Sequence, residues 1–201
     1  MIRKTLIAAA TVAAVMSSAS VFAAVNSSSP ASSTGKFGGG TITFTGSVTE
    51  APCSIPAGEA NQNIDLGVVS NKLLVSPKPG SDPVAVKINL KNCDLGGTPA
   101  YTKASLKFLD DGNLSTSGKN KGLLNTTGST NVSVQLLDRT GTHPIDFTSD
   151  DPMKSGTEVS LSTGVDSTIV FMAHLIGSSG STPLPSAGAI KAQVSYQLDY
   201  H

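Results

Sequence analysis

The chain has 201 residues and carries 14 basic against 14 acidic side chains, a balance that excludes the basic face of a nucleic-acid-binding protein. Glycine, serine, threonine and asparagine are abundant, and tryptophan is missing. Beyond residue 24 no window shows sustained 3.6-residue apolar periodicity, which excludes a mainly helical fold.

The first 23 residues have the pattern of a cleaved secretory signal. Arg3 and Lys4 form a basic start, an alanine-rich apolar run follows, and Ala23 stands where a signal peptidase cuts. The run is only about half of the roughly 20 apolar residues that a membrane anchor needs. Cleavage after Ala23 leaves residues 24–201, 178 residues with 12 basic and 14 acidic side chains, which is enough for one domain and too few for two.

A strand pattern follows a leader without any pattern. Residues 24–36 are small and polar, so we expect a flexible leader there. After the glycines at positions 38–40, the residues alternate strictly, and threonine and serine line one face. The opposite, apolar or small face consists of Ile42, Phe44, Gly46 and Val48. We predict an N-terminal extension over residues 24–49, ahead of a body formed by residues 50–201.

Two cysteines, Cys53 and Cys93, lie in the part of the chain that the signal directs to an oxidising compartment. A single disulfide is the natural interpretation. Two free thiols or a two-ligand metal site remain the alternatives at this point.

Period-two alternation recurs along the body, which predicts strands over residues 84–90, 105–109, 132–137, 159–161, 168–176 and 190–200. Turn-forming residues separate these runs. Such short strands, tied by one disulfide, describe an antiparallel β-sandwich of the immunoglobulin-like kind. In the last run one face consists of Ile190, Ala192, Val194, Tyr196, Leu198 and Tyr200.

Residues for catalysis or metal binding are scarce. The three histidines, His143, His174 and His201, are far apart and lack metal-ligand spacing, and no Gly-x-Ser-x-Gly elbow presents a nucleophile. We therefore expect no enzyme and no cofactor; a secreted metalloenzyme on a β-sandwich is the alternative that the scattered histidines disfavour. The strands at both ends instead invite pairing with another strand, in the same chain or in a neighbour.

Four segments together resemble the type 1 fimbrial (chaperone–usher pilus) subunits of Gram-negative bacteria. They are residues 39–46 followed by Cys53, residues 90–94 with Cys93, residues 134–141 and residues 194–201. The resemblance implies an immunoglobulin-like sandwich that lacks its final strand and keeps a hydrophobic groove open beside residues 190–200. Gly188 and Tyr200 stand where that family has a glycine fourteenth from the end and a penultimate tyrosine.

The resemblance also implies a function. A periplasmic chaperone fills the groove first, and an outer-membrane usher then exchanges the chaperone strand for the donor strand of the next subunit, here the segment with Ile42, Phe44, Gly46 and Val48. The expected protein is a structural pilus subunit that polymerises by donor-strand exchange into a surface filament for attachment. The alternative is a minor or adaptor subunit that binds host glycans itself.

Overall fold

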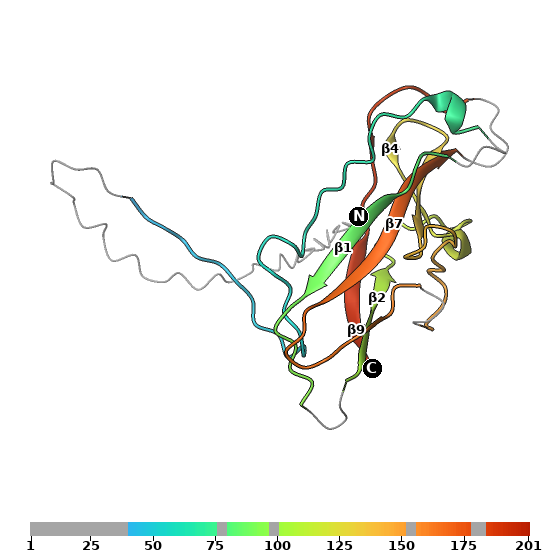
Figure 1. Ribbon diagram of the computed structural model, residues 1–201. Helices are drawn as coiled ribbons and strands as arrows, with labels where there is room; N and C mark the ends of the chain where they lie inside the picture. The colour runs from blue at the N-terminus through green and yellow to red at the C-terminus, as the bar shows by residue number, and fades with distance from the viewer. Residues whose placement is uncertain (1–39, 76–79, 97–100, 152–155, 178–183) are drawn as a thin grey trace, which may run out of the picture. The chain divides into compact units, whose positions relative to one another are not determined.

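The computed structural model describes residues 40–75, 80–96, 101–151, 156–177 and 184–201. The predicted signal over residues 1–23 and the predicted leader over residues 24–36 lie outside these ranges. The chain divides into two units, residues 1–48 and residues 49–201. In the first unit, the described residues 40–48 are exposed and belong to no strand. In the second unit, the described residues form sheets (Figure 1).

The second unit has two main antiparallel sheets and one small one. The first main sheet has the order β1-β7-β5-β3, the second has the order β6-β2-β9, and β4 pairs with β8. The strands are β1 Val84–Leu90, β2 Lys103–Leu109, β3 Leu123–Leu124, β4 Thr127–Gly128, β5 Val132–Leu137, β6 Val159–Ser160, β7 Ser167–Gly177, β8 Ile190–Lys191 and β9 Ser195–Tyr200. Two short 3-10 helices, η1 Asn71–Leu73 and η2 Lys119–Lys121, complete the described elements.

The core lies between the two main sheets, as expected for a sandwich. Alternate residues of β1, β5 and β7 point inward and are buried, and β2 contributes buried side chains from the other sheet. Phe108 on β2 meets Phe171 on β7 edge-to-face, with ring centroids 5.4 Å apart, and so joins the two sheets. The all-β antiparallel fold predicted from the sequence is confirmed.

Cys53 and Cys93 form a disulfide across 40 residues of chain, as the sequence predicted. Backbone hydrogen bonds reinforce it on both sides. Ser54 pairs with Lys91 as an isolated bridge, and the amide of Asp94 donates to the carbonyl of Pro52. The end of β1 is therefore tied firmly to the start of the second unit.

The last predicted strand, residues 190–200, differs from the structure. It divides into β8 and β9, with residues 192–194 outside both strands. The reason is a change of partner, because β8 pairs with β4 whereas β9 pairs with β2 in another sheet. The alternation of half-buried and exposed side chains nevertheless continues through the break.

Of the three histidines, His174 is buried rather than solvated. It lies on β7, between β1 and β5 in the first main sheet, and only 7% of its surface is exposed. Its Nδ1 lies 3.1 Å from the carbonyl oxygen of Ser81, and its Nε2 lies 2.9 Å from Oε1 of Gln135 on β5. Burial lowers the pKa of His174, and the two contacts hold its ring against Ser81 and β5.

The loop after β5 is organised around Asp138. Burial alone would raise the pKa of this carboxyl, but the hydroxyl of Thr140, the backbone amides of Thr142 and His143 and the His143 ring donate hydrogen bonds that lower it to about 2. Because the pKa in the folded chain lies below the ordinary 3.8, the stabilisation is present above pH 3.8 and is lost as the pH falls toward 2.

We expect Asp138→Asn to lower the free energy of unfolding by about 1 to 2 kcal/mol at pH 7, after allowance for solvent screening of this surface loop. At pH 2 the difference should fall to a small fraction of its value at pH 7, because the Asp138 carboxyl is then about half protonated in the folded chain and almost fully protonated in the unfolded chain. Urea unfolding of the wild type and of Asp138→Asn at both pH values measures this difference in the free energy of unfolding. Asp82→Asn, at an exposed aspartate outside this loop, is the matched control. An equal loss at both pH values would contradict the assignment.

Candidate functional site

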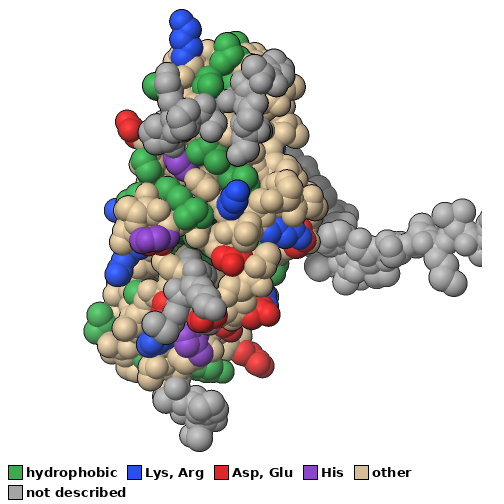
Figure 2. Space-filling model, turned by 90° about the vertical axis from the view of Figure 1, so that its right-hand side faces the viewer, with side chains coloured by type: hydrophobic (Ala, Val, Ile, Leu, Met, Phe, Trp, Pro, Cys, Tyr) green, Lys and Arg blue, Asp and Glu red, His purple; other side chains and the backbone are tan. Residues whose placement is uncertain are grey.

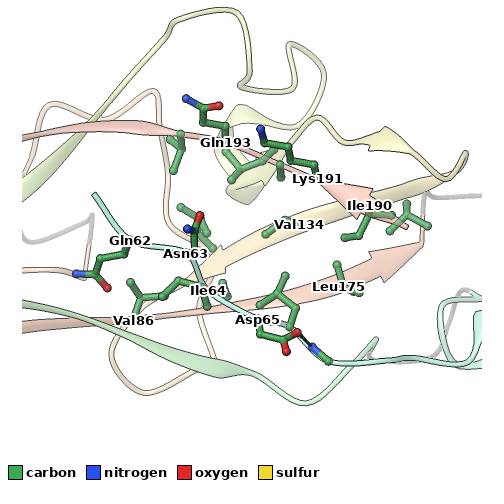
Figure 3. Close-up of a pocket in the computed structure, with 18 of the residues that line it drawn as sticks. Gln62, Asn63, Ile64, Asp65, Val86, Val134, Leu175, Ile190, Lys191 and Gln193 are labelled. Atoms are coloured by element: carbon green, nitrogen blue, oxygen red, sulfur yellow. Dashed lines mark hydrogen bonds between the residues drawn. The ribbon is translucent and has the colours of Figure 1, made fainter. Parts of the chain in front are cut away.

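The second unit contains a long apolar groove with a volume of about 1470 Å³ (Figure 3). Its floor consists of inward-facing core side chains from both sheets. They are Val86, Ile88, Phe108, Leu124, Val132, Val134, Leu136, Phe171, Ala173 and Leu175. The volume exceeds the range of roughly 300–1,000 Å³ that is usual for small-molecule sites. The shape of the site is set by two segments of backbone along its sides, which we call the first and the second flank.

The first flank is the segment of residues 60–69. Leu66 and Val69 pack partly against the core, and the side chain of Gln62 donates to the carbonyl of Lys87 on β1 at 2.7 Å. The segment makes no backbone-to-backbone hydrogen bond to another described residue. The Gly67 amide donates to Oδ1 of Asp65, and the Ala60 carbonyl accepts from the Tyr196 hydroxyl. The other amides and carbonyls of the segment are available to a further strand.

The second flank consists of residues 186–196 and includes β8 and the start of β9. One edge of β8 pairs with β4 and one edge of β9 pairs with β2, while the other edge of each has no strand partner among the described residues. The second flank lies across the groove from residues 62–65, with Val134 between the two sides in the close-up (Figure 3). Unpaired edges on both sides of an apolar floor are the geometry that accepts a strand.

Six of the seven residues predicted for the C-terminal strand region line the groove. They are Gly188, Ile190, Ala192, Val194, Tyr196 and Leu198. Burial raises the pKa of the Tyr196 phenol, whose hydroxyl donates to the carbonyl oxygen of Ala60 at 3.0 Å. The seventh, Tyr200, is not among the lining residues. It packs against Tyr101 with ring centroids 6.1 Å apart, and its buried hydroxyl has no partner in the described part of the chain.

The residues predicted to form the donor face are solvent-exposed in the first unit. The exposed fraction is 78% for Ile42 and 88% for Phe44, and Val48 is fully exposed. A Cβ placed on Gly46 would meet no atom within 4 Å. Large apolar side chains at such exposure alternate along a described segment that has no strand partner, which makes this face a candidate binding surface.

The first flank and the floor were not predicted from the sequence as parts of this site. Ile64, Leu66 and Val68 show the alternation of a strand, but Val68 is fully exposed and Val69 packs inward instead. Gly67, at a φ of +76°, shifts the alternation between inward-facing and outward-facing side chains by one residue at this point. The alternation over residues 64–68 was the sequence pattern that could have predicted the first flank, and the shift at Gly67 weakens this pattern.

Chemistry other than strand pairing has little support in the described ranges. They contain no group of three or more histidine, cysteine, aspartate or glutamate side chains that could hold a metal ion. On the face shown in Figure 2, acidic and basic side chains lie interspersed among neutral ones rather than in one charged area. Among the described residues, no helix has both the length and the apolar character to span a membrane.

Comparison with known proteins gives consistent matches. The family model "Fimbrial protein" matches residues 42–201. A type-1 fimbrial protein A chain of Escherichia coli is 35% identical over 164 residues, which cover 81% of this chain and 83% of that protein. A type 1 fimbrial subunit of Klebsiella pneumoniae is 32% identical over 168 residues, with coverage of 81% and 84%.

Solved structures agree with these sequence matches. The P pilus rod subunit PapA superposes with a TM-score of 0.60 at 26% identity, over 75% of this chain and 100% of that one. A subunit in the structure of a chaperone–usher pilus superposes with a TM-score of 0.63 at 26% identity, over 82% of this chain and 96% of that one.

Proposed function

The chain belongs to the fimbrial protein family, and from this premise we propose that it is a shaft subunit that polymerises by donor-strand exchange. The observation that carries the proposal is the apolar groove, whose two flanks expose unpaired backbone edges. A strand from a neighbouring copy would complete the sheet between the flanks and cover the floor. The groove then holds the sandwich of one copy to the extension of the next.

The proposed donor is the segment that carries Ile42, Phe44, Gly46 and Val48. Moving the side chains of Ile42 and Phe44 from solvent into the groove should contribute roughly 1.5–3 kcal/mol each. Main-chain hydrogen bonds to the two flanks would add about 0.5–1.5 kcal/mol each and set the register. Gly46 would allow the backbone to come close to the floor where a side chain does not fit.

A middle position in the filament follows from the presence of both halves of the contact. An exposed donor face lets the subunit give a strand, and an open groove lets it receive one. In this proposal the signal spans residues 1–23, the donating extension spans residues 24–49, and the receiving body spans residues 50–201. A periplasmic chaperone would cover the groove before assembly, and an outer-membrane usher would catalyse the exchange at the cell surface.

Attachment would then be a property of the filament, through host surface glycans bound along it or at its tip. A shaft role is tested by electron microscopy of cells that lack only this protein. We expect whole filaments to be lost and to return when the gene is supplied in trans. Filaments of normal number with altered length or tips would instead assign the chain to a minor or adaptor position.

A further inference from the structure

Two side-chain hydrogen bonds cross the groove, one near each end. The hydroxyl of Tyr196 on the second flank donates to the carbonyl of Ala60 at 3.0 Å. The Nδ2 of Asn71, just beyond the first flank, donates to the carbonyl of Pro185 at 3.1 Å. By their residue numbers, Ala60 and Asn71 lie eleven positions apart, and so do Pro185 and Tyr196. The two sides therefore run antiparallel in one constant register.

Close to these two crossings, several backbone groups on both sides are already engaged. On the first side, the carbonyl of Glu59 accepts from the Gln62 side chain at 3.0 Å, and the carbonyl of Ser70 accepts from the amide of Leu73 at 2.9 Å. On the second side, Pro185 has no amide hydrogen and its carbonyl is taken by Asn71.

The second flank is also engaged where it begins. The amide of Ser186 donates to the carbonyl of Thr130 at 3.2 Å, and the carbonyl of Ser186 accepts from the hydroxyl of Ser129. A strand that entered the groove would meet a cross-groove hydrogen bond and already engaged backbone groups near each end, and would pair with the remaining backbone groups between the two crossings.

We propose that Tyr196 and Asn71 are the end stops of the groove and limit the inserted strand to about ten residues. This inference rests on the proposed strand exchange and adds to it a length and two positioning residues. The window comprises residues 61–70 on one side and residues 186–195 on the other. Residues 40–49 form a segment of the same length, with all four donor-face residues inside it and the charged Glu50 immediately outside.

The test uses the full chain from residue 24 with Phe44→Asp as acceptor, so that its own donor does not compete. Labelled synthetic peptides of residues 42–49, 40–49, 38–49 and 40–51 are titrated by fluorescence anisotropy. We expect peptide 40–49 to bind more tightly than peptide 42–49. Extension at either end should change the affinity by less than twofold, because each crossing closes the window.

Removal of one end stop should open one end only. In the acceptor with Tyr196→Phe, one of the two extended peptides should bind about fivefold more tightly than peptide 40–49, the gain from one further backbone hydrogen bond. In the acceptor with Asn71→Ala, the other extended peptide should gain. Tyr101→Phe, at a tyrosine that does not line the groove, is the matched control and should leave the length dependence unchanged.

The outcomes separate the two proposals. If no peptide of any length binds the acceptor, strand exchange itself is overturned. If the peptides bind but affinity rises with every extension, or both variants keep the parent length dependence, the end stops are overturned and strand exchange stands. Amide exchange on bound peptide 38–51 tests the same window without a groove variant. Protection confined to residues 40–49 is expected, and protection that continues through both ends would contradict the proposal.

Discussion

Phe44→Asp is expected to abolish strand donation while the body of the subunit still folds and still accepts a strand. The ring of Phe44 is 88% exposed in the single chain, so its replacement removes little from the stability of the chain itself. In the groove, the change removes the roughly 1.5–3 kcal/mol of ring burial and adds the desolvation of a carboxylate, several kcal/mol more. We expect assembly to fall by more than about 100-fold.

The measurement is the formation of detergent-resistant oligomers by the purified chain and of filaments on cells. Thr45→Asp places the same charge on the opposite face of the segment and is the matched control, with assembly expected near the wild-type level. When mixed with wild-type chain, the Phe44→Asp variant should accept a strand and then stop growth, because it has none to give. Filaments of normal length from Phe44→Asp alone would show that another segment is the donor.

Loss of the disulfide is expected to have the largest effect on stability. Cys53 and Cys93 lie 40 positions apart in the sequence, and the chain-entropy model assigns roughly 4 kcal/mol to closing such a loop. The bond also fixes the start of the second unit beside β1, where Ser54 pairs with Lys91. A subunit with an open groove is expected to have a small free energy of unfolding, so the reduced chain should unfold at a much lower urea concentration.

Urea unfolding of the Phe44→Asp variant, with and without dithiothreitol, measures this loss on a chain that does not polymerise. The double variant Cys53→Ala with Cys93→Ala should unfold like the reduced chain and should not respond to dithiothreitol. Equal midpoints for oxidised and fully reduced chains, with reduction verified by thiol titration, would contradict the expected role.

Where a strand pairs along its whole length, period-two alternation predicted it well. Residues 132–137 were predicted and are β5, because this strand pairs with β7 throughout and every second side chain enters the core. Residues 190–200 alternate just as cleanly, yet the structure divides them. Alternation indicates which face of a strand is buried, and the face of residues 190–200 toward the groove is continuous. It does not record which strand supplies the hydrogen bonds, and that partner changes from β4 to β2.

The predicted strand over residues 41–49 also shows that alternation alone does not reveal a pairing partner. Its alternation is strict, but a strand also needs a partner, and the described residues 40–48 have none. The first flank was missed for a local reason, the phase shift at Gly67. The two end stops could not be predicted at all, because the hydrogen bond from Tyr196 to Ala60 joins residues far apart in sequence that no pattern relates.

Residues 40–49 of one copy are proposed to fill the groove of another. A cryo-electron microscopy map of the assembled filament tests it most directly. We expect a strand of density between residues 61–70 and residues 186–195 of each subunit, with the Phe44 side chain over the apolar floor. This strand should be traceable along the chain to Cys53 of the neighbouring copy. An empty groove, or a groove filled by residues 40–49 of the same copy, would contradict strand donation between copies.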